Sequence, residues 1–217
     1  MNELAPGLTP ANATLYSFAF TLVGFILGSI PFSLVIGRLG AGVDIRRYGD
    51  HNPGMTNVLR AAGWKLALPA LLLDAFKGAI PVGIAWFGLG LQGMWIVPVA
   101  LAPVLGHAFS PFLGGRGGKA VAVTFGIWAG LTVGAGPIVL GFLLGLMVAV
   151  FESSSWAMIL AFALFGGFIL PYYGPTSPEF AAVWLGNLLI LLVKHAGDLH
   201  SLPAIRKSLL QKVTHKR

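Results

Sequence analysis

The sequence predicts an all-α protein that crosses a membrane several times, and two observations support this: its composition and its recurring apolar runs. Of its 217 residues, 56% are hydrophobic and only 10% are charged, and the mean hydropathy is +0.83. Soluble domains carry roughly 25% charged residues, so this composition excludes an ordinary soluble domain. Apolar runs recur along the whole chain between charged or Pro/Gly-rich breaks. An isolated apolar run crosses a bilayer as a helix, because its backbone groups must bond internally.

Seven apolar runs are candidates for membrane-spanning helices. The stretch before the first run has no positive charge, so we interpret that run as a span and not as a cleaved signal peptide. Three runs are short for a lipid-exposed span, and we expect some helices to be tilted, broken or shielded by their neighbours. The predicted helices cover residues 15–37, 65–88, 94–109, 120–134, 137–151, 155–171 and 180–195.

The fourteen Lys and Arg residues fall on or close to one side of this arrangement. The connections on the other side, around residues 1–14, 89–93, 135 and 172–179, hold none. The positive-inside rule therefore predicts an N-terminus outside and a cytoplasmic C-terminus, as an odd number of spans requires. The basic tail, about residues 196–217, is expected to be attracted to anionic lipid headgroups. The isoelectric point of about 10.1 is thus explained without a nucleic-acid partner. We find no internal repeat and expect one membrane domain over residues 1–217.

The first charged loop, DIRRYGDHNPGMTNVLR from residue 44 to residue 60, combines cations with turn-forming residues and side-chain amides. Its charge alone fits an ordinary positive-inside loop. A topological signal needs only charge, however, so the amides of Asn52 and Asn57 favour a ligand site. Thr56 and Asn57 are also candidates to cap, or to donate at, a short helix. The charged and titratable residues of the loop are Asp44, Arg46, Arg47, Asp50, His51 and Arg60.

The second charged loop, LGGRGGKAVA, places four glycines around Arg116 and then Lys119 at the start of a predicted helix. Backbone amides, a helix N-terminus and two cations can converge on a phosphate in such a segment. It is not a Walker A motif, because Leu113 occupies the first glycine position and Ala120 follows the lysine. A flexible glycine hinge with topogenic charges is the alternative.

Two further groups of polar residues lie in or beside the apolar runs. Asp74 and Lys77 are one helical turn apart, so they share a face and are either paired or directed into a polar cavity. His107 and His195 lie at predicted cytoplasmic helix ends, where a lone histidine is most often an interface residue with a satisfied hydrogen bond.

Several catalytic patterns are absent from the sequence. It has no Gly-x-Ser-x-Gly elbow, no His-x4-Asp pair, no cysteine, no metal-ligand cluster and no multi-aspartate pattern of an alcohol phosphatidyltransferase. A reaction in this protein would depend mainly on positioning and electrostatics.

Taken in order, these segments resemble the bacterial acyl-phosphate:glycerol-3-phosphate acyltransferases, which are polytopic enzymes of phospholipid synthesis. The similar segments are GSIPFSLVIGR (residues 28–38), DIRRYGDHNPGMTNVLR, DAFKG (residues 74–78), GHAFSPFLGGRGGKAVA (residues 106–122) and His195. They cover nearly the whole chain in the family's order.

The resemblance implies transfer of a fatty acyl group from acyl phosphate to the sn-1 hydroxyl of glycerol 3-phosphate, without a cofactor or metal. It also implies a site on the cytoplasmic face of a bacterial plasma membrane, with the acyl chain between helices and open to the lipid. Because acyl phosphate is already activated, the enzyme needs only to hold two phosphates close together and to stabilise developing charge. We expect catalytic roles for Asp50, Arg60, Lys119 and His195. We expect substrate contacts from Arg46, Asn52, Asn57, His107, Arg116, Gly117, Gly118 and Asp198, with the amides of Gly117 and Gly118 suited to phosphate.

The chain departs from the family's pattern at several positions in these motifs. Asp50 stands where a serine is expected, and His51 and Ala120 stand where glycines are expected. Asp198 falls in a C-terminal signature that usually reads His-Arg-x-Asn. A carboxylate at position 50 should repel a phosphate unless it is neutralised. Three accounts are open: Asp50 pairs with Arg60 or His51 and activity survives, Asp50 acts as a base or cation ligand for another acceptor alcohol, or turnover is lost.

Two other functions fit parts of the sequence. Asp74 and Lys77 in a helix, with a glycine-rich loop that resembles a re-entrant segment, also occur in small anion transporters. A non-catalytic paralogue that binds lipid precursors or a partner enzyme would keep the same motifs. The oligomeric state does not follow from the sequence.

Overall fold

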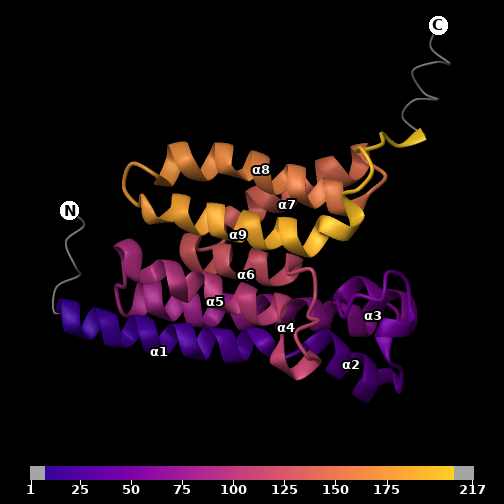
Figure 1. Cartoon of the computed structure of the whole chain (residues 1–217), viewed down its shortest axis with the longest axis horizontal. Coiled ribbons are helices and arrows are strands. Elements are labelled where there is room, and N and C mark those ends of the chain that lie inside the picture. Colours follow the sequence, from indigo (N-terminus) through magenta and orange to yellow (C-terminus); the bar gives the residue numbers. More distant parts are fainter. Residues whose placement is uncertain (1–7, 208–217) are drawn as a thin grey trace, which may run out of the picture.

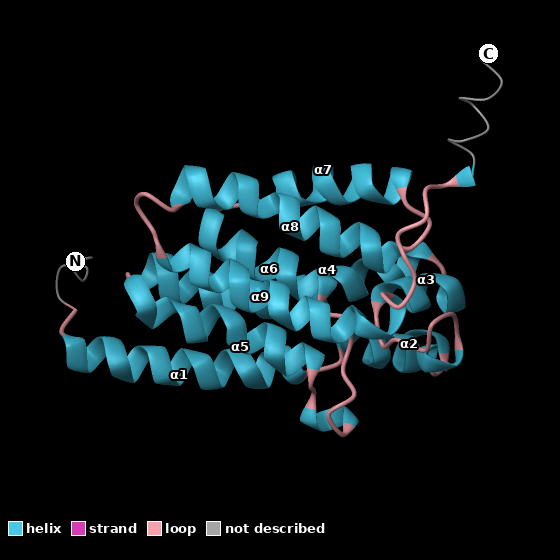
Figure 2. Cartoon of the chain, turned by 45° about the horizontal axis from the view of Figure 1, so that its top comes forward, coloured by secondary structure: helices cyan, strands magenta, loops and turns pink. Residues whose placement is uncertain are grey.

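The computed structural model describes residues 8–207, and its regular secondary structure in this range is helical, apart from one isolated β-bridge (Figures 1 and 2). The last residues of the predicted basic tail, 208–217, lie outside the described range. The helices are α1 (Pro10–Ser29), α2 (Phe32–Ala41), α3 (Met55–Ala62), α4 (Trp64–Gly83), α5 (Ile96–Ala108), α6 (Val121–Thr132), α7 (Ala135–Val150), α8 (Ser154–Tyr173) and α9 (Glu179–His195).

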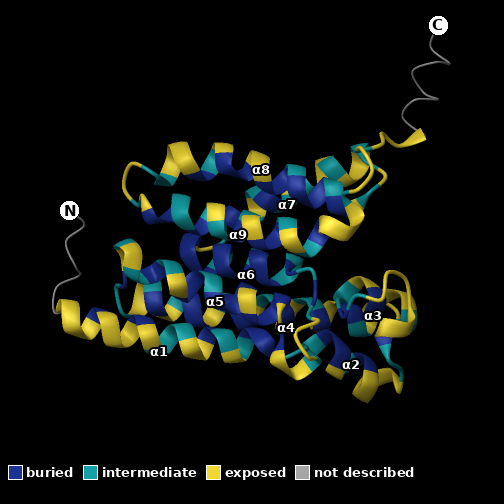
Figure 3. Cartoon of the chain, viewed as in Figure 1, coloured by how far each residue is buried: buried dark blue, intermediate teal, exposed yellow. Residues whose placement is uncertain are grey.

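The predicted fold class is confirmed. Five helical segments are long and apolar enough to cross a membrane: Pro10–Ala41, Trp64–Gly88, Gly93–Leu113, Ser154–Tyr173 and Glu179–Asp198. Two shorter apolar helices, α6 and α7, occupy the remaining predicted positions. Large apolar side chains are exposed along the outer faces of α1, α4, α7 and α9, as lipid contact requires (Figure 3). The direction in which the chain enters the membrane stays a prediction.

The first predicted span is not one continuous helix. The sequence predicts a helix over residues 15–37, whereas α1 ends at Ser29 and α2 begins at Phe32. Ile30 adopts an extended conformation (φ −66°, ψ 120°) because the ring of Pro31 disfavours the helical region for the residue before it. The break frees the Ile30 carbonyl, which accepts a hydrogen bond of 2.8 Å from Lys77 Nζ.

Helix α6 is the shielded short helix that the sequence predicts. It packs against α4, α5 and α7, and its Trp128 side chain is fully buried. Glycines allow the close approach of α4 and α6: a side chain at Gly126 would collide with the Ala75 carbonyl. Helix α7 differs, because Ile138 and Phe142 on its outer face are exposed.

The polar segments gather at one end of the helical bundle. Helices α2 and α3, the start of α6, the loop between α7 and α8, and the end of α9 all lie at the end opposite the start of α1 (Figure 1). The described part of the C-terminal segment runs along the α7–α8 loop, where Ile205 forms an antiparallel bridge with Phe151. Arg206 donates from its main chain to Val150 and from its side chain to Val148 and Phe151. This end of the molecule therefore carries the candidate site.

Candidate active site

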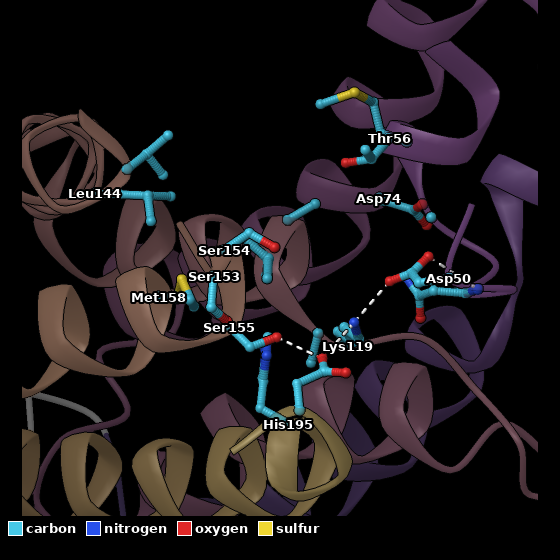
Figure 4. Close-up of a pocket in the computed structure, with 18 of the residues that line it drawn as sticks. Asp50, Thr56, Asp74, Lys119, Leu144, Ser153, Ser154, Ser155, Met158 and His195 are labelled. Atoms are coloured by element: carbon cyan, nitrogen blue, oxygen red, sulfur yellow. Dashed lines mark hydrogen bonds and ion pairs between the residues drawn. The ribbon is translucent and has the colours of Figure 1, made fainter. Parts of the chain in front are cut away.

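A cavity of about 650 Å³ opens at the polar end of the bundle (Figure 4). Its lining comes from α3 and the loop before it, α4, α5, the start of α6, α7, α8 and the end of α9. One part of the lining is charged, and the other part is apolar. The apolar part consists of Met55, Leu71, Ala120, Val121, Ala122, Leu144, Val148 and Met158.

Lys119 is the centre of the charged part of the cavity. Its Nζ lies 2.6 Å from Asp50 Oδ2 and 2.7 Å from Asp198 Oδ2 (Figure 4). These contacts join the first charged loop, the start of α6 and the end of α9, which are far apart in the sequence. The sequence hypothesis that Asp50 pairs with Arg60 or His51 is wrong, because its ion-pair partner is Lys119. His51 instead bonds the Arg46 carbonyl through Nδ1, at 2.8 Å.

Asn57 links Asp50 to Arg60. Its Nδ2 donates to Asp50 Oδ1 at 2.9 Å and to the Asn52 carbonyl at 2.8 Å, and its Oδ1 accepts from Arg60 Nη1 at 3.1 Å. Asn57 lies inside α3 and is buried, and α3 begins after Gly54 without a side-chain cap. Neither Asn57 nor Thr56 therefore caps that helix. Both cations, Arg60 and Lys119, line the same cavity, as the sequence predicts for a phosphate site.

The contacts between Lys119 and its partners shift the pKa values of Asp50 and of Lys119 itself. Both residues lie outside the membrane-spanning helices. Partial burial raises the pKa of Asp50, but the hydrogen bond and positive charge of Lys119 outweigh it and hold that pKa below its usual value. Burial lowers the pKa of Lys119, but the hydrogen bonds to Asp198 and Asp50 together raise it by more. The net pKa therefore lies above the ordinary lysine value. Asp50 is therefore ionised and Lys119 is charged at neutral pH.

A second ion pair lies buried beneath the cavity. Lys77 Nζ is 2.7 Å from Asp74 Oδ1, and both side chains are almost inaccessible, which confirms the pairing predicted from their spacing. Ser33 donates to Asp74 Oδ2 at 2.5 Å. Asp74 also lines the cavity, so the sequence alternatives of a pair and of a polar cavity both hold.

The two histidines line the cavity and differ in their surroundings. His107 Nδ1 lies 3.9 Å from Asp74 Oδ1, too far for a hydrogen bond. His195 is 2% exposed, and its one main-chain neighbour in hydrogen-bonding range, Lys119, lies outside ordinary hydrogen-bond geometry, so at least one ring nitrogen has no partner among the described residues. The expectation that a histidine here has a satisfied hydrogen bond is therefore met for at most one of the two ring nitrogens of His195. A buried imidazole in a cavity wall can bond a ligand there.

The glycines of the second loop serve the fold of the loop instead of lining the cavity. The Gly118 amide donates to the His107 carbonyl at 3.0 Å, and Lys194 Nζ bonds the Gly117 carbonyl at 3.2 Å. A side chain at Gly117 would collide with the His107 carbonyl. The expectation that the Gly118 amide binds phosphate is therefore wrong, because that amide is already bonded, and Gly117 is not part of the lining.

Two predicted substrate-binding cations lie outside the cavity. Arg46 bonds Asp44, with Nη2 2.6 Å from Oδ2, and Arg116 is exposed on the second loop. Neither lines the cavity, whereas Asn52, Asp198 and His107 do. From the glycine-rich segment, Lys119 and the residues directly after it line the cavity.

Both positions where the sequence departs from an expected glycine keep a left-handed backbone. His51 has φ 61° and Ala120 has φ 62°. L-residues rarely adopt this conformation, and glycine adopts it without a steric penalty. The backbone turns that bring Asp50 and Lys119 together are therefore retained by non-glycine residues.

Ser155 belongs to the polar network but is not among the site residues predicted from the sequence. Ser155 Oγ donates to Asp198 Oδ2 at 2.5 Å, and the residues before it also line the cavity. The Glu-Ser-Ser-Ser run at residues 152–155 is the sequence feature that could have predicted this polar contribution to the cavity. It reads as a loop and helix cap, and Ser153 does cap α8, accepting from the Trp156 amide.

Comparison with known proteins identifies the family. Residues 18–204 match the family described as glycerol-3-phosphate acyltransferase. Glycerol-3-phosphate acyltransferase 1 of Thermotoga maritima is 36% identical over 197 residues, which cover 85% of this chain and 97% of that protein. The glycerol-3-phosphate acyltransferase of Paramagnetospirillum magneticum is 42% identical over 184 residues, covering 83% and 87%.

Solved structures agree with this comparison. Crystal structures of PlsY, an integral membrane glycerol 3-phosphate acyltransferase, superpose with a TM-score of 0.75 in its glycerol 3-phosphate form and in its lysophosphatidic acid form. The sequence identities are 29% and 28%, and each alignment covers 84% of this chain and 90% or 89% of the PlsY chain. With the matched residues extending over nearly all of the described helices and every segment that lines the cavity, the chain belongs to the glycerol-3-phosphate acyltransferase family of multi-pass membrane proteins.

Proposed function

We propose that this protein transfers a fatty acyl group from acyl phosphate to the sn-1 hydroxyl of glycerol 3-phosphate and releases lysophosphatidic acid and phosphate. One observation carries the proposal: a single cavity joins a cation-lined polar end to an apolar wall, in a chain of this family. The reaction requires the same combination, since two phosphates and an acyl chain must meet. The two PlsY structures are a glycerol 3-phosphate form and a lysophosphatidic acid form, which correspond to the acceptor and the product of this reaction.

The chemistry needs no covalent enzyme intermediate. The sn-1 oxygen forms a bond to the acyl carbonyl carbon, and the bond from that carbon to the phosphate oxygen breaks. The phosphate leaves with the bonding electrons, and the hydroxyl proton ends on the released phosphate. The protein therefore has to position the two substrates and to stabilise the charge on the carbonyl oxygen and on the leaving group.

Arg60 and Lys119 are the cations suited to hold the phosphates. Both line the cavity, and Asn57 and Asp50 connect them through hydrogen bonds. A guanidinium binds a phosphate through two parallel bonds, whereas an ammonium acts as a compact charge that can follow a moving group. We assign Arg60 and Lys119 to the phosphates, while Asn52, Asp198 and His107 contribute to the lining.

His195 is the residue suited to orient the acceptor hydroxyl or the acyl carbonyl. It is buried in the cavity wall, and the Lys119 main chain satisfies at most one of its ring nitrogens, so at least one is unpartnered among the described residues. A buried polar group without a partner is costly, so a substrate that supplies the missing bond gains affinity and a fixed orientation. Asn57, the second residue expected to orient the substrate, is buried and is not part of the cavity lining, so we assign it to positioning Asp50 and Arg60.

The apolar wall is suited to the acyl chain. Leu71 of α4, Leu144 of α7 and Met158 of α8 line it together with residues at the start of α6. Apolar side chains exposed on α4 and α7 continue toward the lipid-facing surface. The donor can therefore keep its chain in the bilayer while its phosphate reaches Lys119. The positive-inside rule supports our proposal that the site faces the cytoplasm, in a bacterial plasma membrane.

An assay of purified protein in lipid tests the proposal. Palmitoyl phosphate and isotopically labelled glycerol 3-phosphate should give labelled lysophosphatidic acid and one equivalent of phosphate. Absence of product, with a related acyltransferase active under the same conditions, would refute the proposal. Flux of phosphate across proteoliposomes without acyl transfer would instead support a transporter.

A further inference from the structure

The Asp50 carboxylate already occupies a site built for an anion. Lys119 Nζ bonds its Oδ2 at 2.6 Å, and Asn57 Nδ2 and the Asn52 main-chain amide bond its Oδ1 at 2.9 and 3.3 Å. An ammonium, a side-chain amide and a main-chain amide thus converge on two oxygen atoms. The same set of donors suits phosphate oxygens.

The donors that hold Asp50 are those that the substrate needs. Asp74 is neutralised by Lys77. Apart from the histidines, the other titratable side chains along the cavity are three carboxylates and two cations: Asp50, Glu152, Asp198, Arg60 and Lys119. Lys119 is shared between two of these carboxylates, so a phosphate that enters meets a cation whose charge is already balanced.

The loop geometry allows Asp50 to leave Lys119. Its side chain is 42% exposed, so rotation about the side-chain bonds can carry the carboxylate toward solvent. The residues on either side, Gly49 and His51, both have left-handed backbone angles that hold the loop turned toward the cavity. A change of partner by the carboxylate therefore requires rotation of the side chain and no change in the loop backbone.

From this geometry, and given the proposed function, we infer that Asp50 is an internal competitor for the substrate phosphate. It occupies the anion site at Lys119 in the empty protein, and glycerol 3-phosphate binds by displacing it. Asp50 therefore lowers the affinity for phosphate compounds and sets the concentration of acceptor at which the enzyme works. The proton of the attacking hydroxyl does not pass through Asp50.

Binding measurements on matched variants test this inference. Asp50→Asn removes the charge and keeps the shape of the side chain. Asp44→Asn makes the same change in the same loop, at a carboxylate that bonds Arg46 outside the cavity. Titration calorimetry with inorganic phosphate and with glycerol 3-phosphate should give a Kd at least about tenfold lower for Asp50→Asn than for wild type, a change of about 1.4 kcal/mol. The Kd of Asp44→Asn should equal that of wild type.

Acyl-transfer kinetics give the second readout. Asp50→Asn should lower the KM for glycerol 3-phosphate and raise kcat/KM. An equal or weaker Kd, or a fall of kcat/KM by a hundredfold at unchanged KM, would overturn the inference, the latter because it indicates a base. Asp50→Ser provides the same test with a smaller neutral side chain if Asp50→Asn does not fold.

The two readouts separate this inference from the proposed function. Calorimetry needs no turnover, so a tighter Kd in a protein that makes no lysophosphatidic acid would retain the competitor and refute the acyltransferase. Product formation by wild type, with an unchanged Kd in Asp50→Asn, would support the acyltransferase and refute the competitor.

Discussion

Replacing Lys119 with glutamine removes the one cation that separates two carboxylates. In the structure its Nζ lies 2.6 Å from Asp50 and 2.7 Å from Asp198, so the two carboxylate oxygens are no more than about 5.3 Å apart. Two unit charges at that distance repel by about 3 kcal/mol at an effective dielectric constant of 20 and by about 0.8 kcal/mol in water. Because both aspartates are partly exposed, we expect Lys119→Gln to destabilise the protein by about 1–2 kcal/mol at neutral pH.

The loss of stability should depend on pH in a defined direction. In the wild type, Lys119 holds the pKa of Asp50 below its usual value although burial raises it, so the pair stabilises the fold above about pH 4 and this contribution is lost as the pH falls through the lowered pKa. In Lys119→Gln the pKa of Asp50 rises toward its usual value, because the bond and charge of Lys119 no longer lower it, so ionisation of Asp50 adds less stability as the pH increases. The difference in thermal unfolding between wild type and variant should be largest at pH 7 and shrink below pH 4.

The same variant should lose acyl transfer. Removing one donor that stabilises charge in a transition state typically lowers kcat by about 10²–10³. Lys65→Gln, at an exposed lysine at the start of α4, is the matched control and should retain both activity and stability. Equal kcat/KM for Lys119→Gln and wild type, or a stability difference that grows on acidification, would refute this reasoning.

Four further variants test separate parts of the structure. Asp74→Asn leaves the buried Lys77 ammonium without its counter-ion and should cost about 3–5 kcal/mol, measured by denaturation in detergent; a cost below about 1 kcal/mol would contradict the buried pair. Val133→Gly replaces a β-branched residue that is 78% exposed at φ 49°, so we expect about 1 kcal/mol of added stability, seen as a higher Tm. Arg206→Ala removes the side-chain bonds to two carbonyls at the end of α7 and should cost about 1–2 kcal/mol and speed limited proteolysis of the α7–α8 loop; an unchanged cleavage rate would argue against that role. Leu144→Trp narrows the apolar wall and should lower kcat/KM for palmitoyl phosphate relative to octanoyl phosphate by about tenfold, whereas an unchanged ratio would place the acyl chain elsewhere.

The positions of the helices could be predicted from the sequence, because a bilayer requires a continuous apolar run wherever the chain crosses it. The buried pair of Asp74 and Lys77 could be predicted for a similar reason, since residues one turn apart necessarily share a face. The break between α1 and α2 was missed although Pro31 signals it, because the hydropathy of the run continues across the proline.

The side-chain partners within the site could be predicted only in part. The charged loops indicate that Arg60 and Lys119 face one ligand, and both line the cavity. The pairing of Asp50 with Lys119 depends on how two loops distant in the sequence pack, and neither loop pattern specifies it. The same holds for the Gly118 amide, which bonds the His107 carbonyl because α5 and the loop meet closely in the fold.

A structure with glycerol 3-phosphate bound in lipid tests the central claim most directly, because the claim concerns where the phosphate lies. We predict phosphate oxygens within hydrogen-bond distance of Arg60 and Lys119, with Asp50 turned away from Lys119 Nζ. Phosphate bound at Arg46 or Arg116, with the contact between Asp50 and Lys119 intact, would contradict this account.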